Sequence, residues 1–131
     1  MAGAELESRL RTLVARAPDE VLAVYLYGSR ARGTASMESD VDLAVLLRTR
    51  PAPTLKGVAR DLEALIERGL RVPVEVIVLN AAAPDLAHRV LRDGVVLLDR
   101  DRAARLRFEV QSRNEYFDLA PLRRLYRRAA G

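Results

Sequence analysis

Two apolar runs joined by a polar segment most constrain what this chain can fold into. Val21–Tyr27 is short, rich in β-branched and aromatic residues, and stops at Gly28, which is typical of a buried strand. After Ser29 and ten further residues, Asp40–Leu47 forms a second apolar run that opens with Asp-Val-Asp. A buried strand, a glycine turn and a strand that begins with two carboxylates predict a sheet with a polar site at one end.

The rest of the chain alternates between helical and strand-like apolar spacing. No repeat or long linker divides the 131 residues, so we expect a single domain over residues 1–131. The alternation predicts an α/β (α+β) fold with a small mixed β-sheet flanked by helices. Further strands are expected over Val74–Leu79 and Val95–Leu98. Helices are expected over Leu6–Ala17, Arg30–Arg32, Leu55–Gly69, Pro84–Gly94 and Arg102–Leu119. The apolar side of the last helix is Leu106, Val110 and Phe117, and a basic turn is expected after Pro121.

Composition excludes several classes of protein and site. The chain contains no cysteine, so disulfides, thiolate zinc sites and a cysteine nucleophile are ruled out. Charged residues near the N-terminus, such as Glu5, Glu7 and Arg9, interrupt the apolar core that a secretory peptide would need, and no later segment is long enough to span a bilayer. We therefore expect a cytoplasmic protein with no membrane partner.

Positive charge is concentrated at the C-terminal end. Of the 22 basic and 18 acidic residues, nine basic and four acidic ones lie in Arg100–Gly131. A basic tail can bind nucleic acid, bind an acidic protein or only contact water, and a solvated terminal turn is the commonest outcome. Nucleic acid is therefore an alternative partner that the sequence does not favour.

The Asp-Val-Asp sequence at the start of the second strand suggests a cation site. Side chains two residues apart on a strand share a face, with Cα atoms roughly 6.5–7 Å apart, so Asp40 and Asp42 would converge while Val41 enters the core. Such a rigid pair suits Mg²⁺, which binds a few protein oxygens and completes its octahedron with water and phosphate oxygens. The alternative is a solvent-facing edge strand, and these two residues alone favour that alternative.

The turn between the two strands shifts the balance toward a phosphate site. Gly-Ser at the end of a buried strand, leading into a short helix, presents backbone N–H groups where phosphate binds readily. Ser29 would donate a hydrogen bond to a triphosphate oxygen, and Gly28 would let the backbone approach without a Cβ clash. An ordinary turn also explains Gly-Ser alone, but the full spacing to Asp40 and Asp42 should arise by chance on the order of once in a thousand chains of this size.

These residues resemble the signature of a known superfamily. Gly28–Gly33 (GSRARG) followed by Ser39–Val45 (SDVDLAV) is similar to the motif of the DNA polymerase β-like nucleotidyltransferases, in the small minimal nucleotidyltransferase (MNT) branch. Val74–Asn80, Pro84, Gly94 and Phe108–Leu119 resemble the downstream layout of MNT antitoxins that pair with HEPN toxins. The resemblance covers nearly the whole chain and implies a single minimal nucleotidyltransferase domain with the polymerase β-like fold.

The resemblance also implies a third carboxylate on a neighbouring strand, and the matching position is Glu75. The family usually has Asp there, and Glu moves the carboxylate oxygens outward by one methylene. A lone carboxylate within an apolar strand needs a metal or a partner to offset desolvation, which favours the site. The alternative is an edge strand with Glu75 in water. By resemblance, the catalytic and Mg²⁺-binding residues are Asp40, Asp42 and Glu75, and Gly28, Ser29 and Arg30 bind the nucleotide, ATP.

Other residues have simpler explanations. His88 is the sole histidine, so without a second imidazole or a nucleophile we expect a surface or packed residue rather than a catalyst. Tyr25 and Tyr27 fit alternating strand positions as core or site wall. Tyr116 and Phe117 are expected to pack the last helix.

By resemblance, we expect a Mg²⁺-dependent nucleotidyltransferase, a protein adenylyltransferase that moves AMP from ATP to a tyrosine hydroxyl of a HEPN ribonuclease toxin. It would be the antitoxin of a type VII-like toxin–antitoxin pair and form a hetero-oligomer with the toxin. The alternatives are a catalytically weak or inactive antitoxin that neutralises the toxin by binding alone, and nucleotidyl transfer to a small molecule or an RNA end. The chain is short for a separate acceptor-binding domain, which favours a protein partner that brings the acceptor.

Overall fold

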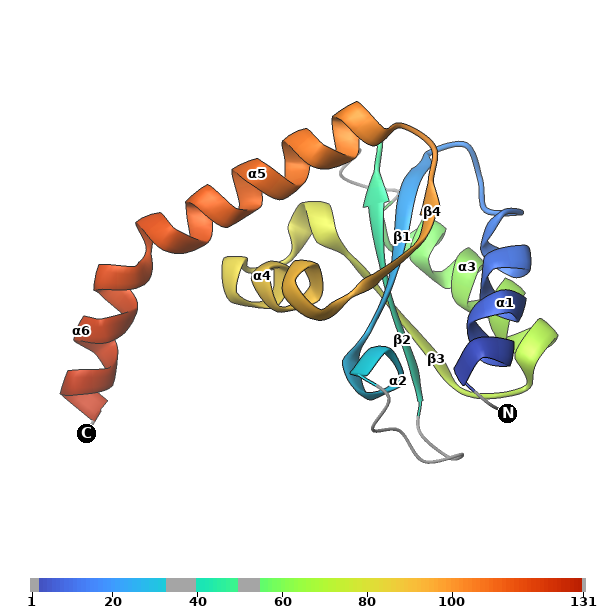
Figure 1. Ribbon diagram of the computed structural model, residues 1–131, viewed down its shortest axis with the longest axis horizontal. Coiled ribbons are helices and arrows are strands. Elements are labelled where there is room, and N and C mark those ends of the chain that lie inside the picture. Colours follow the sequence, from blue (N-terminus) through green and yellow to red (C-terminus); the bar gives the residue numbers. More distant parts are fainter. Residues whose placement is uncertain (1–2, 33–39, 50–54, 131) are drawn as a thin grey trace.

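The computed structural model describes residues 3–32, 40–49 and 55–130, which form one sheet with helices on both faces (Figure 1). Every expected strand forms, and each ends within one residue of the expected position. In the described part of the chain, no helix has the length and apolar character needed to cross a membrane. The elements are α1 (Gly3–Val14), β1 (Val21–Tyr27), α2 (Gly28–Arg32), β2 (Val41–Leu47), α3 (Leu55–Leu70), β3 (Val74–Val78), η1 (Leu79–Ala81), α4 (Pro84–Asp93), β4 (Val95–Asp99), α5 (Arg102–Asp118) and α6 (Ala120–Ala130).

The four strands form a mixed sheet in the order β3-β2-β1-β4. β1 pairs antiparallel with both β2 and β4, whereas β2 pairs parallel with β3. Parallel neighbours need a crossover connection, and α3 supplies it between β2 and β3. The expected fold class, a small mixed sheet flanked by helices, is confirmed.

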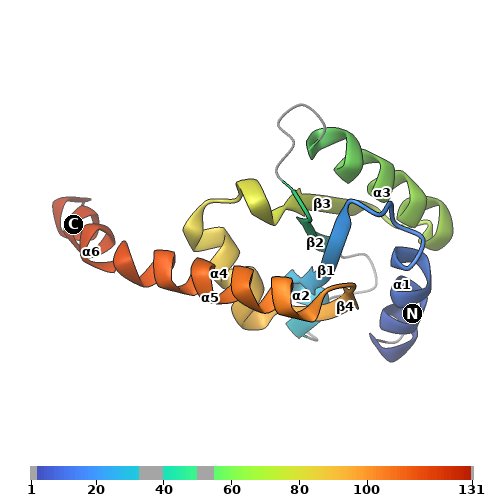
Figure 2. The ribbon, with the colours of Figure 1, turned by 90° about the horizontal axis from the view of Figure 1, so that it is seen from above.

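The sheet separates two apolar layers (Figures 1 and 2). On one face lie α1 and α3, where Leu62 of α3 packs in the same buried cluster as Leu43 of β2. On the other face lie α4 and the first part of α5, where Val90 of α4 packs in the cluster of Ala44. Because side chains alternate along a strand, Asp42 projects on the α4 side of the sheet, like Ala44.

The edge strand β3 is held in register by two glutamates of α3. The N–H of Val74 donates to Oε1 of Glu67 at 3.0 Å, and the N–H of Val76 donates to Oε1 of Glu63 at 2.9 Å. These contacts satisfy backbone donors that an edge strand would otherwise leave to water or to another chain. They therefore help to fix where β3 places its own side chains.

One expectation for the C-terminal end is wrong. The residues after Pro121 continue as a helix rather than a turn; proline fits there because the first turn of a helix has no internal acceptor for its N–H groups. Leu106, Val110 and Phe117 lie on the expected helix, but the rest of the chain leaves them 40%, 52% and 58% exposed. The side of α5 that contacts the body carries half-buried Phe108 instead.

Candidate active site

Asp42 and Glu75 lie side by side on adjacent strands. They are register partners in the parallel pairing of β2 with β3, and Tyr27 is the partner of Asp42 in the antiparallel pairing with β1. Residues paired across a sheet share a face, so the three side chains form a polar row on the α4 side. Asp42 and Tyr27 are half-buried in this row, and Glu75 is exposed at the sheet edge.

Asp40 adds a third carboxylate just before β2, where it is exposed. The pKa of Asp42 is raised above its ordinary value, first by burial and then by the negative charges of Glu75 and Asp40. This repulsion shows that Asp42 lies within electrostatic reach of both other carboxylates. The site therefore concentrates negative charge at one end of the sheet, a condition that favours a bound cation.

Gly28 forms a tight turn directly against Asp42. Its φ angle is +75°, in the left-handed region that side chains with a Cβ rarely adopt. A Cβ atom at this position would lie 2.5 Å from Oδ2 of Asp42, closer than real contacts allow. Glycine is thus required here both by the backbone conformation and by the carboxylate beside it.

Tyr27 and Arg89 complete the polar surroundings of the row. The pKa of Tyr27 is raised to about 12, chiefly by burial and then by the charges of Asp42 and Glu75, while Arg89 acts in the opposite direction. Arg89, on α4, therefore brings a positive charge within reach of the row. The sequence does not mark this residue, because its position depends on how α4 packs over the sheet.

The remainder of the predicted nucleotide turn is described only in part. Arg30 is half-buried on α2, two residues after Gly28, which lies against Asp42. The side chains of Ser29 and Arg32, and the whole of Gly33 and Ser39, lie outside the described residues. The predicted hydrogen bond from Ser29 to a phosphate oxygen therefore stays a prediction.

Glu75 combines two expectations that were stated as alternatives. It lies on an edge strand and is exposed, so the argument that burial forces it to find a partner is wrong. Its register with Asp42 nevertheless places it beside the other carboxylates. Among the described residues, no three histidine, cysteine or acidic side chains are gathered closely enough to form a ready metal site.

His88 has a packing role, as expected. Its ring stacks on Tyr116 with centroids 3.7 Å apart and planes 5° from parallel, and Phe117 meets it edge-on at 6.0 Å. The stack joins α4 to the last turn of α5. His88 therefore contributes to the position of α5 rather than to the polar row.

Comparison with known proteins identifies the family. Residues 10–103 match the family described as Polymerase beta, Nucleotidyltransferase, a span that runs from α1 to the start of α5. The chain belongs to this family. The polar row and the turn at Gly28 lie inside the matched span.

Within the family, the chain is similar to the protein adenylyltransferase MntA of Shewanella oneidensis. The two are 35% identical over 72 residues, which cover 54% of this chain and 49% of MntA. The chain thus matches about half the length of this curated relative. Together with the family match, this similarity agrees with the nucleotidyltransferase resemblance that the motifs suggested.

Solved structures share the fold over nearly the whole chain. A chain from a crystal structure of a toxin–antitoxin with AMP-PNP superposes with a TM-score of 0.78 at 23% identity, covering 95% of this chain and 97% of that one. A chain from the complex of tri-AMPylated Shewanella oneidensis HEPN toxin with MNT antitoxin gives a TM-score of 0.75 at 19% identity, covering 98% of each. These likenesses extend beyond residue 103, to the C-terminal helices.

Proposed function

We propose that this chain is a Mg²⁺-dependent nucleotidyltransferase that transfers AMP from ATP to a tyrosine hydroxyl of a HEPN toxin, and that it acts as the antitoxin of that pair. One observation carries the proposal: Asp42 is in register with Glu75 and directly against Gly28, so two carboxylates border a turn that lacks a side chain. The family and the similarity to the adenylyltransferase MntA support this reaction class.

The chemistry of the three carboxylates suits Mg²⁺. Asp40 and Asp42 would bind the ion and Glu75 would complete the set, since all three offer the hard oxygen ligands that Mg²⁺ prefers. Burial, and after it the negative charges of Glu75 and Asp40, raise the pKa of Asp42, and a cation would offset that repulsion. When bound, Mg²⁺ would neutralise charge on the triphosphate and lower the pKa of the attacking hydroxyl.

The turn at Gly28 is suited to the phosphates of ATP. Its backbone N–H groups can approach phosphate oxygens because no Cβ intervenes. Ser29 would donate a hydrogen bond there, and the guanidinium of Arg30 would make charge-assisted contacts with the same oxygens. These residues would hold the α-phosphorus near the carboxylates, which is the main requirement of phosphoryl-type transfer.

The reaction forms a bond between the tyrosine oxygen and the α-phosphorus and breaks the bond from that phosphorus to pyrophosphate. Glu75 is exposed beside Asp42, so an incoming hydroxyl can reach it, and it would accept the proton that the tyrosine loses. The pKa of Tyr27 is raised to about 12, so this side chain is protonated at neutral pH and lines the site as a hydrogen-bond donor.

A second candidate function is neutralisation by binding alone. Glu75 stands where the family usually has Asp, and its longer side chain displaces the carboxylate oxygens by one methylene. Mg²⁺ demands near-ideal octahedral geometry. An antitoxin that had lost catalysis would still cover its toxin.

The two candidates differ in whether label is transferred. The full chain is incubated with Mg²⁺, ATP labelled at the α-phosphate and a cognate HEPN toxin. The toxin should become labelled with the wild type and with Asp61→Asn, an exposed control on α3, but not with Asp42→Asn. If the wild type transfers no label and the double variant Asp40→Asn, Asp42→Asn still neutralises the toxin, binding alone is the function. Label on RNA or on a small molecule instead would identify a different acceptor.

A further inference from the structure

The C-terminal helices α5 and α6 carry an apolar surface that the rest of the chain leaves uncovered. These two helices, residues 102–130, form an arm. In both views the arm extends away from the sheet, with α6 farthest from it (Figures 1 and 2). Within the described residues, every large hydrophobic side chain that is exposed lies on the arm: Leu106, Val110, Phe117, Leu122, Leu125 and Tyr126.

These side chains form stripes rather than isolated points. On α5, Leu106, Val110 and Phe117 are spaced by four and by seven residues, so they share one side of the helix. On α6, Leu125 and Tyr126 follow Leu122 by one helical turn and are 62% and 69% exposed. A contiguous apolar surface of this kind marks an interaction site more often than a solvated face.

An open groove of about 950 Å³ follows the α5 stripe. All of its lining residues belong to α5 or to Leu119 just after it, and they include Leu106 and Val110. The groove thus has one wall from this chain and no facing helix within the described residues. A partner would have to supply the opposite wall.

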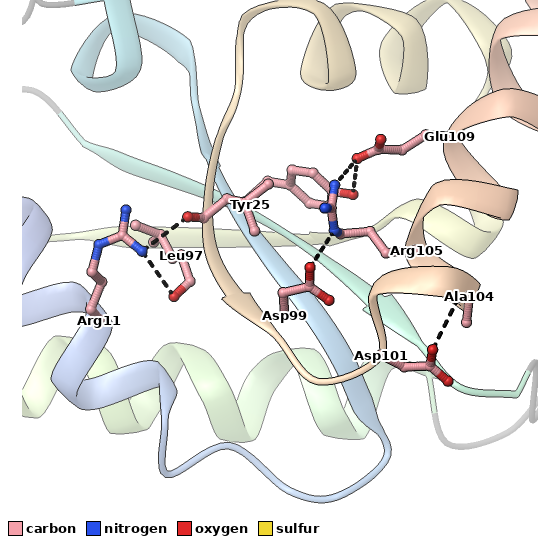
Figure 3. A network of polar contacts seen from close by, with 9 residues as sticks. Arg11, Tyr25, Leu97, Asp99, Asp101, Ala104, Arg105 and Glu109 are labelled. Carbon is pink, nitrogen blue, oxygen red and sulfur yellow. Dashed lines mark hydrogen bonds and ion pairs between the residues drawn. The ribbon is translucent and has the colours of Figure 1, made fainter.

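The base of the arm is fixed to the sheet, so the surface is presented in a defined direction. The hydroxyl of buried Tyr25 donates to Oε1 of Glu109 at 2.7 Å, and Arg105 bridges Glu109 at 2.7 Å and Asp99 at 2.8 Å (Figure 3). Asp101 caps the first turn of α5 by accepting from the N–H of Ala104. A rigid base reduces the entropy lost when the arm binds a partner.

Nearly all of the arm lies outside the span that matches the family. The family match ends at residue 103, whereas the arm continues to residue 130. The chains that superpose from toxin–antitoxin structures cover 95% and 98% of this chain, too much to omit the arm. The arm thus accompanies the nucleotidyltransferase fold in proteins whose crystals also contain a toxin.

Charge selects the kind of partner. Residues 100–131 hold nine basic and four acidic residues, and α6 holds four arginines and no acidic residue. A second copy of the arm would bring the same excess of positive charge and be repelled. A partner whose apolar face is bordered by carboxylates would be attracted to it.

We propose that the arm is the docking surface for the toxin, and that its stripes and groove receive an apolar helical face of the toxin that carries acidic residues where it meets the arginines of α6. This inference rests on the proposed function, because it takes the HEPN toxin as the partner. Docking on the arm would hold the acceptor tyrosine in the neighbourhood of the polar row, so the catalytic domain needs no acceptor-binding domain of its own.

The test places carboxylates on the apolar stripes. The double variant Val110→Asp, Leu125→Asp changes two exposed positions of the arm, and the control Thr12→Asp, Ala64→Asp adds the same charge at exposed positions on α1 and α3. Thermal unfolding and ATP binding should match the wild type in both. The arm variant should bind the HEPN toxin about tenfold or more weakly and raise the KM for the toxin by a similar factor, with kcat nearly unchanged. Affinity of the wild type should fall as salt is raised.

The outcomes separate this inference from the proposed function. If the arm variant binds the toxin as tightly as the control does while label is still transferred, the docking surface is elsewhere and the enzyme stands. If the wild type binds the toxin through the arm but transfers no label, the docking surface stands and the catalytic proposal falls. An affinity that does not respond to salt would overturn the acidic border of the partner surface, and a wild type that binds no toxin would overturn both.

Discussion

Asp42 and Glu75 are register partners on the parallel strands β2 and β3, and the charge of Glu75 raises the pKa of Asp42. The two carboxylates are brought together by backbone pairing, without any hydrogen bond between them in the described contacts. The folded state therefore carries a repulsion that the unfolded chain lacks. Such a cost is expected at a site selected for binding rather than for stability.

The first prediction concerns Asp42→Asn. Since the pKa of Asp42 is raised on folding, the folded state binds its proton more tightly, and stability is lost as pH rises from the unfolded value of about 3.9 through the folded value. At pH 7, without Mg²⁺, the variant should therefore be more stable than the wild type, by less than about 1 kcal/mol after solvent screening. Its transfer activity should fall by about a thousandfold or more, because a metal ligand is lost.

Urea unfolding of both proteins between pH 4 and pH 7 in the presence of EDTA checks the stability half of this prediction. The difference should shrink as pH falls toward 4, where protonation of Asp42 in the unfolded chain sets in, and grow as pH rises. A variant that is less stable at pH 7 would show that Asp42 is stabilised in the fold, not repelled.

The second prediction concerns Gly28→Ala. The added Cβ would lie 2.5 Å from Oδ2 of Asp42, and alanine would have to adopt a φ angle of +75°. We expect a loss of about 1–3 kcal/mol in the free energy of unfolding and a larger loss of transfer activity, since relief of the clash moves the carboxylate. Gly57→Ala is the matched control, because nothing lies within 4 Å of a Cβ there and the helix gains about 0.5–1 kcal/mol. Equal stability of the two variants would contradict the turn geometry.

The third prediction separates the charge of Glu75 from its length. Glu75→Gln should lower the transfer rate by about 10²–10⁴-fold, while Glu75→Asp should keep more of the rate because it retains the carboxylate. Both should unfold within about 0.5 kcal/mol of the wild type, as Glu75 is exposed. Ring-carbon NMR of Tyr27 gives a readout without ATP: its pKa, about 12 in the wild type, should decrease in Glu75→Gln and not in Glu75→Asp. If the pKa of Tyr27 is the same in Glu75→Gln as in the wild type, Glu75 lies outside the row.

Local patterns were enough to predict most of the fold. The apolar run Val21–Tyr27 and the helical spacing of Leu62 and Ile66 each depend on one period, so they predict an element without knowledge of its neighbours. The exposure of the apolar side of α5 could not be predicted in this way. Leu106 and Val110 have the spacing of a core face, but the helix extends past the sheet and leaves them exposed. A periodic apolar stripe predicts a helix, and it does not show whether the same chain covers that stripe.

The candidate site was predictable to the extent that the strands determine it. Asp40 and Asp42 share a face because they are two residues apart, and the resemblance supplied the match to Glu75. The exposure of Glu75 depends on β3 being the edge strand, which is a property of the sheet order. Arg89 reaches the row only through the packing of α4, so no spacing in the sequence marks it.

The last prediction concerns Tyr25→Phe at the base of the arm. Tyr25 is 2% exposed and donates to Glu109, so losing the hydroxyl should lower the free energy of unfolding by about 1 kcal/mol at pH 8.

Burial and then Glu109 raise the pKa of Tyr25 well above its ordinary value of 10.0. Above pH 10 the unfolded chain loses this proton and the folded protein keeps it, so wild-type stability falls by about 1.4 kcal/mol per pH unit. The variant lacks this dependence, and the advantage of the wild type should disappear within about one pH unit above 10. Urea unfolding of both proteins from pH 8 to pH 11 measures it, and parallel curves would mean that Tyr25 ionises as readily in the folded protein as in the unfolded chain.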